Sequence, residues 1–301
     1  MNPLQQEILA LKRERNALIL AHYYQSMDIQ EIADFVGDSF DLARRAKEAQ
    51  AQVIVFCGVR FMAQSAKVLN PDKTVLLPAP DAGCPMADMI GAEDVGRLRD
   101  MYPGAALVCY INSSTAVKAA SDICCTSSSA LRIVSSLPNR RILFIPDQNL
   151  GAYTASRLPD KEIILYDGYC PSHHRVTEED VLAARRAHPG APVLAHPECR
   201  PAVLAHADYV GSTSGILEQA GKGESAEYLI GTETGIVERL RRTVPGKLFY
   251  PVTHRLFCPN MKKTRLADVR YALAENVHEI RLDPLEMEGA RRSLMRMIAA
   301  G

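Results

Sequence analysis

Residues 18–22 of the chain read LILAH, an apolar run with the length of a buried β-strand that ends on a histidine. Two later segments end in a similar way, ALVCY at residues 106–110 and PVLAH at residues 192–196. Self-similar segments at a long interval indicate a repeated architecture. The sequence therefore predicts three copies of one structural unit.

A hydroxyl residue follows each of these strands at the same distance. Ser39, Ser127 and Thr213 each stand 17 residues beyond the last strand residue (22 to 39, 110 to 127 and 196 to 213). The flanks match as well, since ADFVGDS at 33–39 resembles ADYVGST at 207–213, and a helix-like pattern follows both. Each hydroxyl is therefore expected at the start of a helix.

Each copy continues with two more strands and then a Cys-Pro pair. The predicted strands are 53–57 and 73–77 in the first copy, 141–145 and 162–166 in the second, and 227–230 and 247–250 in the third. The pairs begin at Cys84, Cys170 and Cys258, which stand 43 to 45 residues beyond the hydroxyl. Amphipathic helices are expected after them, clearest at 92–102 and 177–187, the second opening on a capping-box pattern.

Alternating strands and helices are typical of parallel sheets with right-handed crossovers. We expect an α/β fold of three pseudo-symmetric α/β/α sandwich domains whose parallel sheets are arranged about a pseudo-threefold axis. The expected domains are residues 1–87, 88–174 and 175–262. Residues 263–301 are expected to form a helix, a strand and a helix that complete one of the sheets.

Composition narrows the class of protein. The 301 residues are 47% apolar, and 35 basic residues balance 35 acidic ones, so neither nucleic acid nor a membrane surface is an expected partner. The N-terminus lacks a signal-like pattern and no apolar run is long enough for a membrane span, which favours a cytoplasmic location. The eight cysteines then indicate thiols or metal ligands rather than disulfides.

The repeat places reactive side chains at one edge of each sheet. His22, Tyr110 and His196 end the three first strands, and the Cys-Pro pairs lie beyond the fourth strands. Ligands of open α/β sheets bind beyond the carboxyl ends of the strands. If the three units meet about a common axis, these residues converge on one crevice.

Three cysteines from three units can hold a [4Fe–4S] cluster, one per chain, and leave one iron open to act as a Lewis acid in dehydration. The alternative is a set of buried structural thiols, which is the interpretation for Cys57, Cys109, Cys124, Cys125 and Cys199. A tetrahedral zinc site is a third possibility, with His173 or His254 as the fourth ligand.

Two further features suit anionic substrates and proton transfer. Ser39, Ser127 and Thr213 at helix starts would offer donors where the helix dipole favours an anion, or else act as plain N-caps. Glu198, two residues beyond His196, is a candidate general acid or base. Burial of this carboxylate would bring its pKa toward neutrality. Read alone, such a carboxylate is more often a solvated surface group.

Six blocks of the sequence resemble the signature blocks of the quinolinate synthase family. They are AHYYQ (21–25), GDS (37–39), YINSS (110–114), PDQNLG (146–151), HPEC (196–199) and GSTS (211–214). The resemblance extends over essentially the whole chain, and its three cluster cysteines fall on Cys84, Cys170 and Cys258.

The resemblance implies a transferase of NAD biosynthesis that condenses iminoaspartate with dihydroxyacetone phosphate to quinolinate, with release of phosphate and water. An aspartate oxidase or dehydrogenase would supply the first substrate. Proton transfer is implied for Tyr24 and Glu198. The implied substrate contacts are His22, Ser39, Tyr110, Ile111, Asn112, Ser127, His173, His196, Pro197, Glu198 and Thr213. No cysteine follows Cys258, so the C-terminal cysteine switch of some members is not expected.

Three other functions remain open from the residues alone. A hydro-lyase acting on a small hydroxy acid would use the same open iron. An iron–sulfur sensor without turnover would need a partner surface, of which the balanced charge gives no sign. A purely structural repeat protein would be colourless when purified without oxygen.

Overall fold

The computed structural model describes residues 1–300, and within them it contains three four-stranded sheets whose paired strands all run parallel. The first sheet has the order β2-β1-β3-β4, with β1 Ala17–His22, β2 Phe35–Gly37, β3 Val53–Cys57 and β4 Thr74–Leu76. The second has the order β6-β5-β7-β8, with β5 Ala106–Tyr110, β6 Ile123–Cys125, β7 Arg141–Ile145 and β8 Glu162–Leu165. The third has the order β10-β9-β11-β12, with β9 Val193–Ala195, β10 Tyr209–Val210, β11 Glu227–Gly231 and β12 Leu248–Pro251. The predicted α/β class and its triplication are confirmed.

Helices connect the strands, and we call each sheet with its helices a unit. The first unit has α1 Pro3–Glu14, α2 Met27–Ile32, α3 Ser39–Glu48 and α4 Arg60–Leu69. The second has α5 Ala92–Met101, α6 Thr115–Ala119, α7 Ala130–Ser136, α8 Gln148–Arg157 and α9 Pro171–His174. The third has α10 Glu178–Ala187, α11 Pro201–Leu204, α12 Thr213–Lys222, α13 Gly235–Thr243 and the 3₁₀ turn Asn260–Lys262. The capping box at the start of α10 forms as predicted, because Thr177 and Asp180 exchange backbone-to-side-chain hydrogen bonds.

Strand β1 is apolar up to its final histidine because the first sheet is covered on both faces. In β1, Leu20 packs into one hydrophobic cluster with Leu42 of α3, whereas its neighbour Ile19 packs into another with Ile8 of α1. Successive side chains of a strand point to opposite faces, so an unbroken apolar run is what a two-faced core requires. This explains why LILAH shows no alternation of polar and apolar residues.

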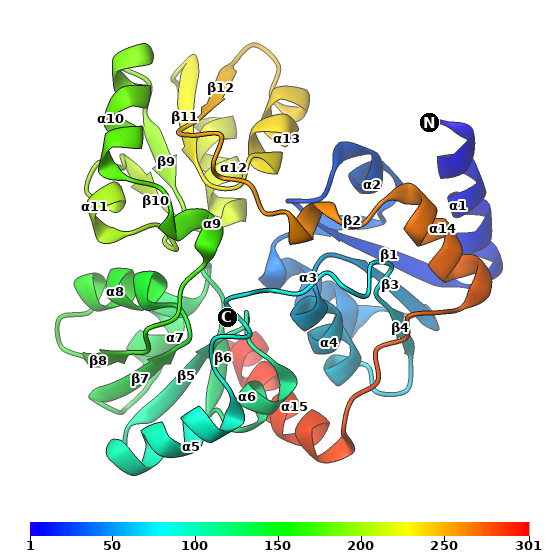
Figure 1. Cartoon of the computed structure of the whole chain (residues 1–301), viewed down its shortest axis with the longest axis horizontal. Coiled ribbons are helices and arrows are strands. Elements are labelled where there is room, and N and C mark those ends of the chain that lie inside the picture. Colours follow the sequence, from blue (N-terminus) through cyan, green and yellow to red (C-terminus); the bar gives the residue numbers. More distant parts are fainter. Residues whose placement is uncertain (301) are drawn as a thin grey trace.

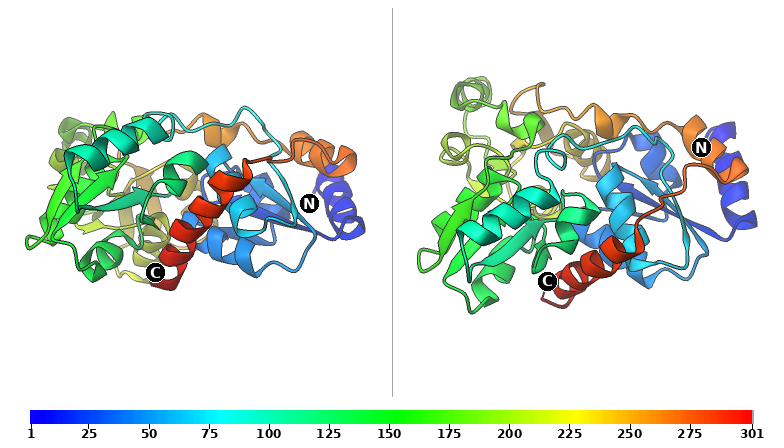
Figure 2. Two further views of the ribbon diagram at one scale, coloured as in Figure 1. Left: turned by 90° about the horizontal axis from the view of Figure 1, so that it is seen from below. Right: turned by 60° about the horizontal axis from the view of Figure 1, so that its bottom comes forward.

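The three units surround a common centre, where the carboxyl ends of their sheets meet (Figure 1). One hydrophobic cluster extends through all of them and includes Phe56 of the first unit, Val108 of the second and Ile230 of the third. Seen from the side, the molecule is flatter than it is wide, and the last helix lies across the lower face (Figure 2). Shared apolar packing therefore ties the units together around the central region.

The C-terminal segment differs from the expected helix-strand-helix. It contains α14 Leu266–Glu275 and α15 Pro284–Ala300, and between them only a single antiparallel bridge joins Glu279 to Leu76 of β4. Asn276 and His278 have positive φ angles of 53° and 63°, so the connecting backbone turns repeatedly and cannot extend into a strand. The segment therefore meets the β4 edge of the first sheet without adding a fifth strand to it.

Helix α15 packs closely against α6 of the second unit at Gly289. A β-carbon at this position would lie 2.8 Å from the β-carbon of Ala119 and 3.0 Å from its carbonyl oxygen. In contrast, a β-carbon at the exposed Gly96 of α5 would meet no atom within 4 Å. Alanine is ordinarily the better helix residue, so these two glycines separate helix propensity from packing.

We expect Gly96→Ala to stabilise the fold by about 0.5–1 kcal/mol because alanine loses less backbone entropy in a helix. We expect Gly289→Ala to destabilise it by about 1–2 kcal/mol, because overpacking costs roughly 1–3 kcal/mol and outweighs that gain. Chemical denaturation of both variants and the parent measures the two changes. Equal stabilisation by both substitutions would show that α15 does not approach α6 as described.

Candidate metal and substrate site

The same backbone hydrogen bond places each of the three cysteines. In every unit, the amide nitrogen just beyond the third strand donates to the carbonyl oxygen two residues before the cysteine, at 2.8 Å. The three pairs are Arg60 with Ala82, Gln148 with Gly168 and Thr234 with Leu256. Each Cys-Pro loop is thus attached at the carboxyl end of its own sheet, which faces the centre.

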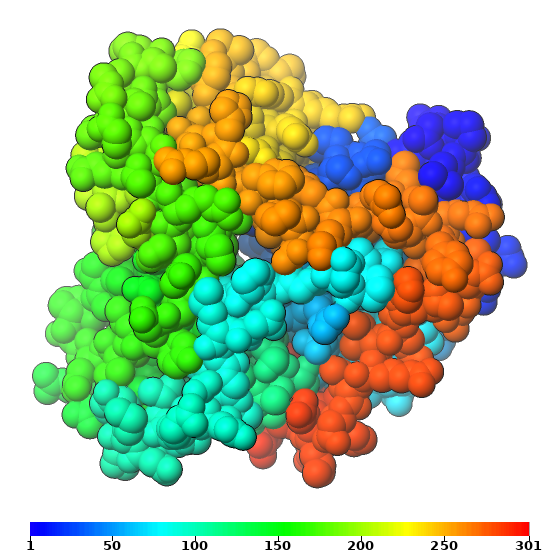
Figure 3. Space-filling model, viewed as in Figure 1, coloured from blue at the N-terminus to red at the C-terminus, as the bar shows by residue number. Residues whose placement is uncertain are grey.

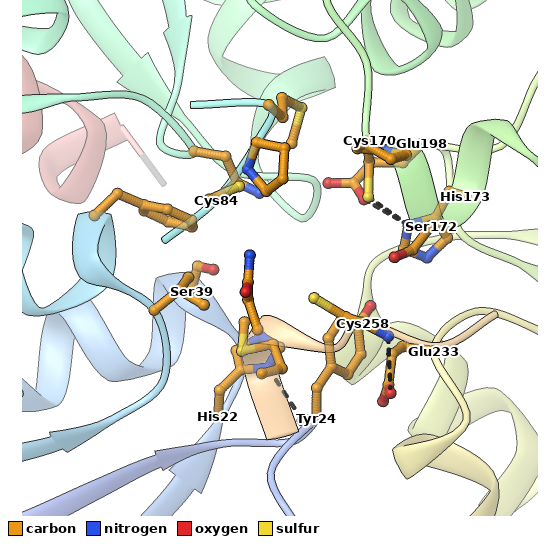
Figure 4. A pocket seen from close by; sticks show the side chains of 18 of the residues that line it. His22, Tyr24, Ser39, Cys84, Cys170, Ser172, His173, Glu198, Glu233 and Cys258 are labelled. Atoms are coloured by element: carbon orange, nitrogen blue, oxygen red, sulfur yellow. Dashed lines mark hydrogen bonds and ion pairs between the residues drawn. The ribbon is translucent and has the colours of Figure 1, made fainter. Parts of the chain in front are cut away.

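Cys84, Cys170 and Cys258 line one cavity between the three units, with roughly 930 Å³ of atom-free space. They approach it from three different sides (Figure 4). The space-filling view shows a narrow opening where the segments that carry them meet (Figure 3). The five other cysteines, assigned as structural thiols, are fully buried in the described chain and do not line this cavity.

The three thiols share an environment that favours a metal over free thiolates. Burial raises the pKa of Cys84 to about 12, and it also raises the pKa values of Cys170 and Cys258. Negative charge on any one of them raises the pKa of its neighbours further. A set of three sulfur ligands suits the iron of an iron–sulfur cluster, whose positive metal ions would offset this repulsion. The three cysteines therefore fit an iron–sulfur cluster.

A second set of metal-ligating groups overlaps this site. Atoms of Cys170, His173 and Glu198 lie within 4.8 Å of one another. His173 Nδ1 is 3.2 Å from Cys170 Sγ and 2.7 Å from a Glu198 oxygen. His254, the other candidate zinc ligand, is exposed and does not line the cavity.

His22 and His196 present the same ring nitrogen to the cavity. Tyr24 N–H donates to His22 Nδ1 at 3.1 Å, and Glu198 N–H donates to His196 Nδ1 at 3.3 Å. Burial lowers the pKa of His22 to about 3 and that of His196 to about 4, so both rings are neutral. With Nδ1 accepting, the single ring proton must sit on Nε2, which makes each histidine a hydrogen-bond donor to a ligand.

Glu198 is fully buried and remains ionised. Burial acts to raise its pKa, but hydrogen bonds with His173 and with the hydroxyl of Tyr110, which donates to it at 2.6 Å, hold that pKa well below its usual range. The expected shift toward neutrality is therefore not observed, because the buried carboxylate has hydrogen-bonding partners. Glu198 is also not the solvated surface group that was the alternative.

A continuous chain of hydrogen bonds links Glu198 to Tyr24. His173 Nε2 lies 3.0 Å from the Thr232 hydroxyl, which lies 2.8 Å from the Tyr24 hydroxyl. Tyr24 in turn lies 3.2 Å from the Thr213 hydroxyl. Burial and the charge of Glu198 raise the pKa of Tyr24, which keeps its hydroxyl protonated. The two residues implied for proton transfer are thus connected, and Thr232 is a member that the sequence did not reveal.

The three repeated hydroxyls all line the cavity but differ in local structure. Ser39 and Thr213 are the first residues of α3 and α12, and the capping bonds come from Asp38 and Ser212 just before them. Ser127 lies in a turn three residues before α7, not at a helix start as expected. The turn is fixed by Thr126, whose carbonyl oxygen accepts from the amides of Ser129 and Ala130. The plain N-capping alternative is therefore wrong for Ser39 and Thr213.

Asn112 is the clearest sign that the cavity receives a polar ligand. Its side-chain oxygen is buried and has no hydrogen-bond partner within residues 1–300. Buried polar atoms are nearly always paired, so an unpaired one in a cavity calls for a ligand. Ile111 and Pro197, also implied as contacts, are buried and do not line the cavity.

Arg175 is a lining residue that sequence reasoning missed. It is exposed, and its Nε donates to the carbonyl oxygen of Pro171 at 2.8 Å. Among the residues that line the cavity in the described chain, it is the sole permanent cation. Its position five residues after Cys170 was the available signal, because the Cys-Pro pair opens the short helix α9 that carries it to the rim.

Comparison with known proteins agrees with the resemblance seen in the sequence. The family model described as "Quinolinate synthetase A protein" matches residues 6–299. The quinolinate synthase of Caldicellulosiruptor saccharolyticus is 52% identical over 295 residues, covering 98% of this chain and 97% of that protein. That of Methanoregula boonei is 50% identical over 296 residues, covering 98% of each.

Within residues 1–300, every helix falls short of the length and apolar character needed to cross a membrane.

The quinolinate synthase of Clostridium kluyveri is 48% identical over 293 residues, covering 97% of both chains. The family model and these relatives thus match the chain over nearly its whole length. The chain belongs to the quinolinate synthetase A family.

Proposed function

We propose that this protein is an iron–sulfur transferase of NAD biosynthesis that condenses iminoaspartate with dihydroxyacetone phosphate. The products are quinolinate, phosphate and water. The observation that carries the proposal is the meeting of Cys84, Cys170 and Cys258 in one cavity with Tyr24 and Glu198. An aspartate oxidase or dehydrogenase would supply the unstable imine.

The three cysteines would hold one [4Fe–4S] cluster per chain. When bound, such a cluster supplies an iron with an open position, a Lewis acid that polarises hydroxyl or carboxylate oxygens and eases loss of water. The rest of the cavity is supplied by side chains that orient the substrates and exclude solvent.

Both substrates are anions, and the cavity receives them mainly with neutral donors. The Nε2–H groups of His22 and His196 and the hydroxyls of Ser39 and Ser127 line the cavity together. His196 Nε2 already lies 3.2 Å from the Ser127 hydroxyl, so these two donors can bind one oxyanion. Holding two reactants side by side can remove several kcal/mol from a bimolecular barrier.

Glu198 and Tyr24 are suited to opposite proton transfers. The ionised Glu198 carboxylate can accept a proton from a carbon next to the imine or carbonyl group. Tyr24, protonated and linked to Glu198 through Thr232 and His173, can donate one to a leaving oxygen. The linkage allows the pair to return to its starting protonation state after each turnover.

The direct test is to purify the protein anaerobically, supply dihydroxyacetone phosphate and iminoaspartate, and measure quinolinate. Parent protein should contain about four irons per chain, as the cubane stoichiometry requires, and form quinolinate. Cys84→Ser, Cys170→Ser and Cys258→Ser should each lose the brown absorbance and the activity. Cys57→Ala, which alters a buried thiol outside the cavity, is the control and should keep both.

Colourless parent protein would refute the cluster, and iron-loaded protein that dehydrates a hydroxy acid but forms no quinolinate would favour the hydro-lyase instead. Full activity in any one of the three serine variants would remove that cysteine from the ligand set. These outcomes separate the cofactor from the substrates.

Glu198→Gln should keep the iron content and lower kcat by about 10²–10⁴-fold, the usual contribution of a positioned general base. Glutamine preserves the shape and an acceptor for Tyr110 but cannot take up the proton. Iron analysis alongside steady-state kinetics makes the measurement. If iron is lost as well, the metal sits instead among Cys170, His173 and Glu198; if turnover is unchanged, Glu198 is not the base.

Arg175 should act where the anionic substrates enter. An exposed cation at the mouth of a cavity raises the local concentration of anions, and added salt weakens that effect. We expect Arg175→Gln to raise the KM for dihydroxyacetone phosphate about 3- to 10-fold with kcat little changed, and to flatten the dependence of kcat/KM on salt.

The matched control is Arg132→Gln, which removes an exposed arginine that does not line the cavity. Its KM and salt dependence should equal those of the parent. An unchanged KM in Arg175→Gln, or the same change in both variants, would show that Arg175 plays no part in substrate capture.

A further inference from the structure

The PDQNLG block, which the substrate site does not use, carries a buried acid with an unusual pair of contacts. Asp147 is fully buried, and one of its oxygens accepts from the amide of Leu150 at 2.7 Å as the N-cap of α8. Its second oxygen accepts from the amide of Cys170 at 3.2 Å. A single carboxylate thus joins the start of a helix to a cluster cysteine.

The third unit repeats this arrangement with a different residue. Glu233 is fully buried, and one of its oxygens accepts from the amide of Gly235, the first residue of α13, at 2.8 Å. The other accepts from the amide of Cys258 at 3.4 Å. Asp147 and Glu233 both stand two residues beyond the end of the third strand of their unit. Asp147 caps its helix and Glu233 does not, yet each acid accepts from one amide at the start of a helix and from the amide of one cysteine.

Two glycines keep the space that these contacts need. A β-carbon on Gly235 would lie 2.8 Å from a Glu233 carboxylate oxygen. One on Gly168, two residues before Cys170, would lie 2.5 Å from the carbonyl oxygen of Pro146. Both distances are shorter than van der Waals contact allows, so only glycine permits the approach. Glycine at these positions thus allows the Cys170 loop to approach Pro146, the neighbour of Asp147, and Glu233 to approach the start of α13.

The first unit lacks the acid. Val59 stands two residues beyond the end of β3, as Asp147 and Glu233 do beyond β7 and β11. It caps α4 without a side-chain hydrogen bond. Within residues 1–300, the Cys84 loop is held to its sheet by the bond from Arg60 to Ala82 but by no carboxylate. The feature thus belongs to two of the three cysteines.

We infer that Asp147 and Glu233 are positioning residues for the cluster: each fixes the backbone of one ligating cysteine, Cys170 or Cys258, against the helix that follows the third strand. The inference rests on the proposed cluster. Buried carboxylates that accept from ligand backbones orient the sulfur atoms and also occupy N–H groups that could otherwise bond to cluster sulfurs. Second-layer partners of this kind govern how firmly a metal group is held.

Asp147→Asn separates this role from helix capping. Asparagine is as good an N-cap as aspartate, so it can keep the bond to Leu150, but its NH₂ group cannot accept from Cys170. Glu233→Gln removes the acceptor for Cys258 in the third unit and also the charge that Glu233 presents to Lys262, 3.4 Å away. Asp122→Asn is the matched control, because Asp122 also accepts a backbone N–H, that of Leu107 at 2.8 Å, but does not line the cavity or contact a cysteine loop.

The measurements are the rate at which an iron chelator bleaches the anaerobic protein, the EPR spectrum of the reduced cluster, and thermal unfolding of the metal-free chain. Asp147→Asn and Glu233→Gln should lose iron about tenfold faster or more and shift the EPR spectrum. Asp122→Asn should leave both unchanged. The metal-free melting points should fall no further than that of Asp122→Asn, because the bonds to the amides of Leu150 and Gly235 persist.

Parent-like bleaching rates and spectra in both acid variants would overturn the inference, as would equal changes in the control. Faster iron loss with an unaltered EPR spectrum and a lowered melting point would mean that the acids only stabilise the fold. Absence of iron from the parent protein would refute the proposed cluster itself, an outcome distinct from all of these.

Discussion

The backbone hydrogen bond between the end of each third strand and the residue two positions before each cysteine sets the place of all three thiols. It is made three times at the same length, and it depends only on main-chain atoms, so the residues around it can vary. Arg60, Gln148 and Thr234 have little in common as side chains. Because the carboxyl ends of the sheets meet at the centre, a repeated local bond becomes a shared site.

The charges around that site are strongly unequal. His22 and His196 are neutral because burial lowers their pKa values, whereas Glu198 stays ionised because His173 and the hydroxyl of Tyr110 hydrogen-bond to its carboxylate. The interior therefore offers hydrogen-bond donors and one base rather than a cluster of cations. Such a cavity can bind anions without holding them so tightly that products remain. The cation, Arg175, lies at the rim rather than in the interior.

Much of the fold followed from the sequence, because register is a property of the chain. The intervals from His22 to Ser39 and from Ser39 to Cys84 recur, and they correspond to three sheets of the same strand order and to three cysteines at one cavity. Ser127 kept its interval but not its helical start. Its segment spends three more residues in a turn, which spacing alone does not show.

Other parts of the site depend on contacts between units, which sequence intervals do not encode. Thr232 joins His173 to Tyr24 across three segments that are far apart in the chain. The low pKa of Glu198 likewise comes from hydrogen bonds with Tyr110 and His173, both of which belong to the second unit. The strand expected in the C-terminal segment is reduced to one bridge at Glu279, because two residues just before it have positive φ angles.

The packing of α15 against the first two units affects the order in which the chain folds while it is being synthesised. Helix α15 packs on α4 of the first unit and on α6 and β6 of the second, and Leu294 lies within the hydrophobic cluster that the units share. While residues 284–300 are still inside the ribosome, the first two units lack the helix that covers their junction. The two units can therefore complete their shared apolar packing only after this helix has been synthesised.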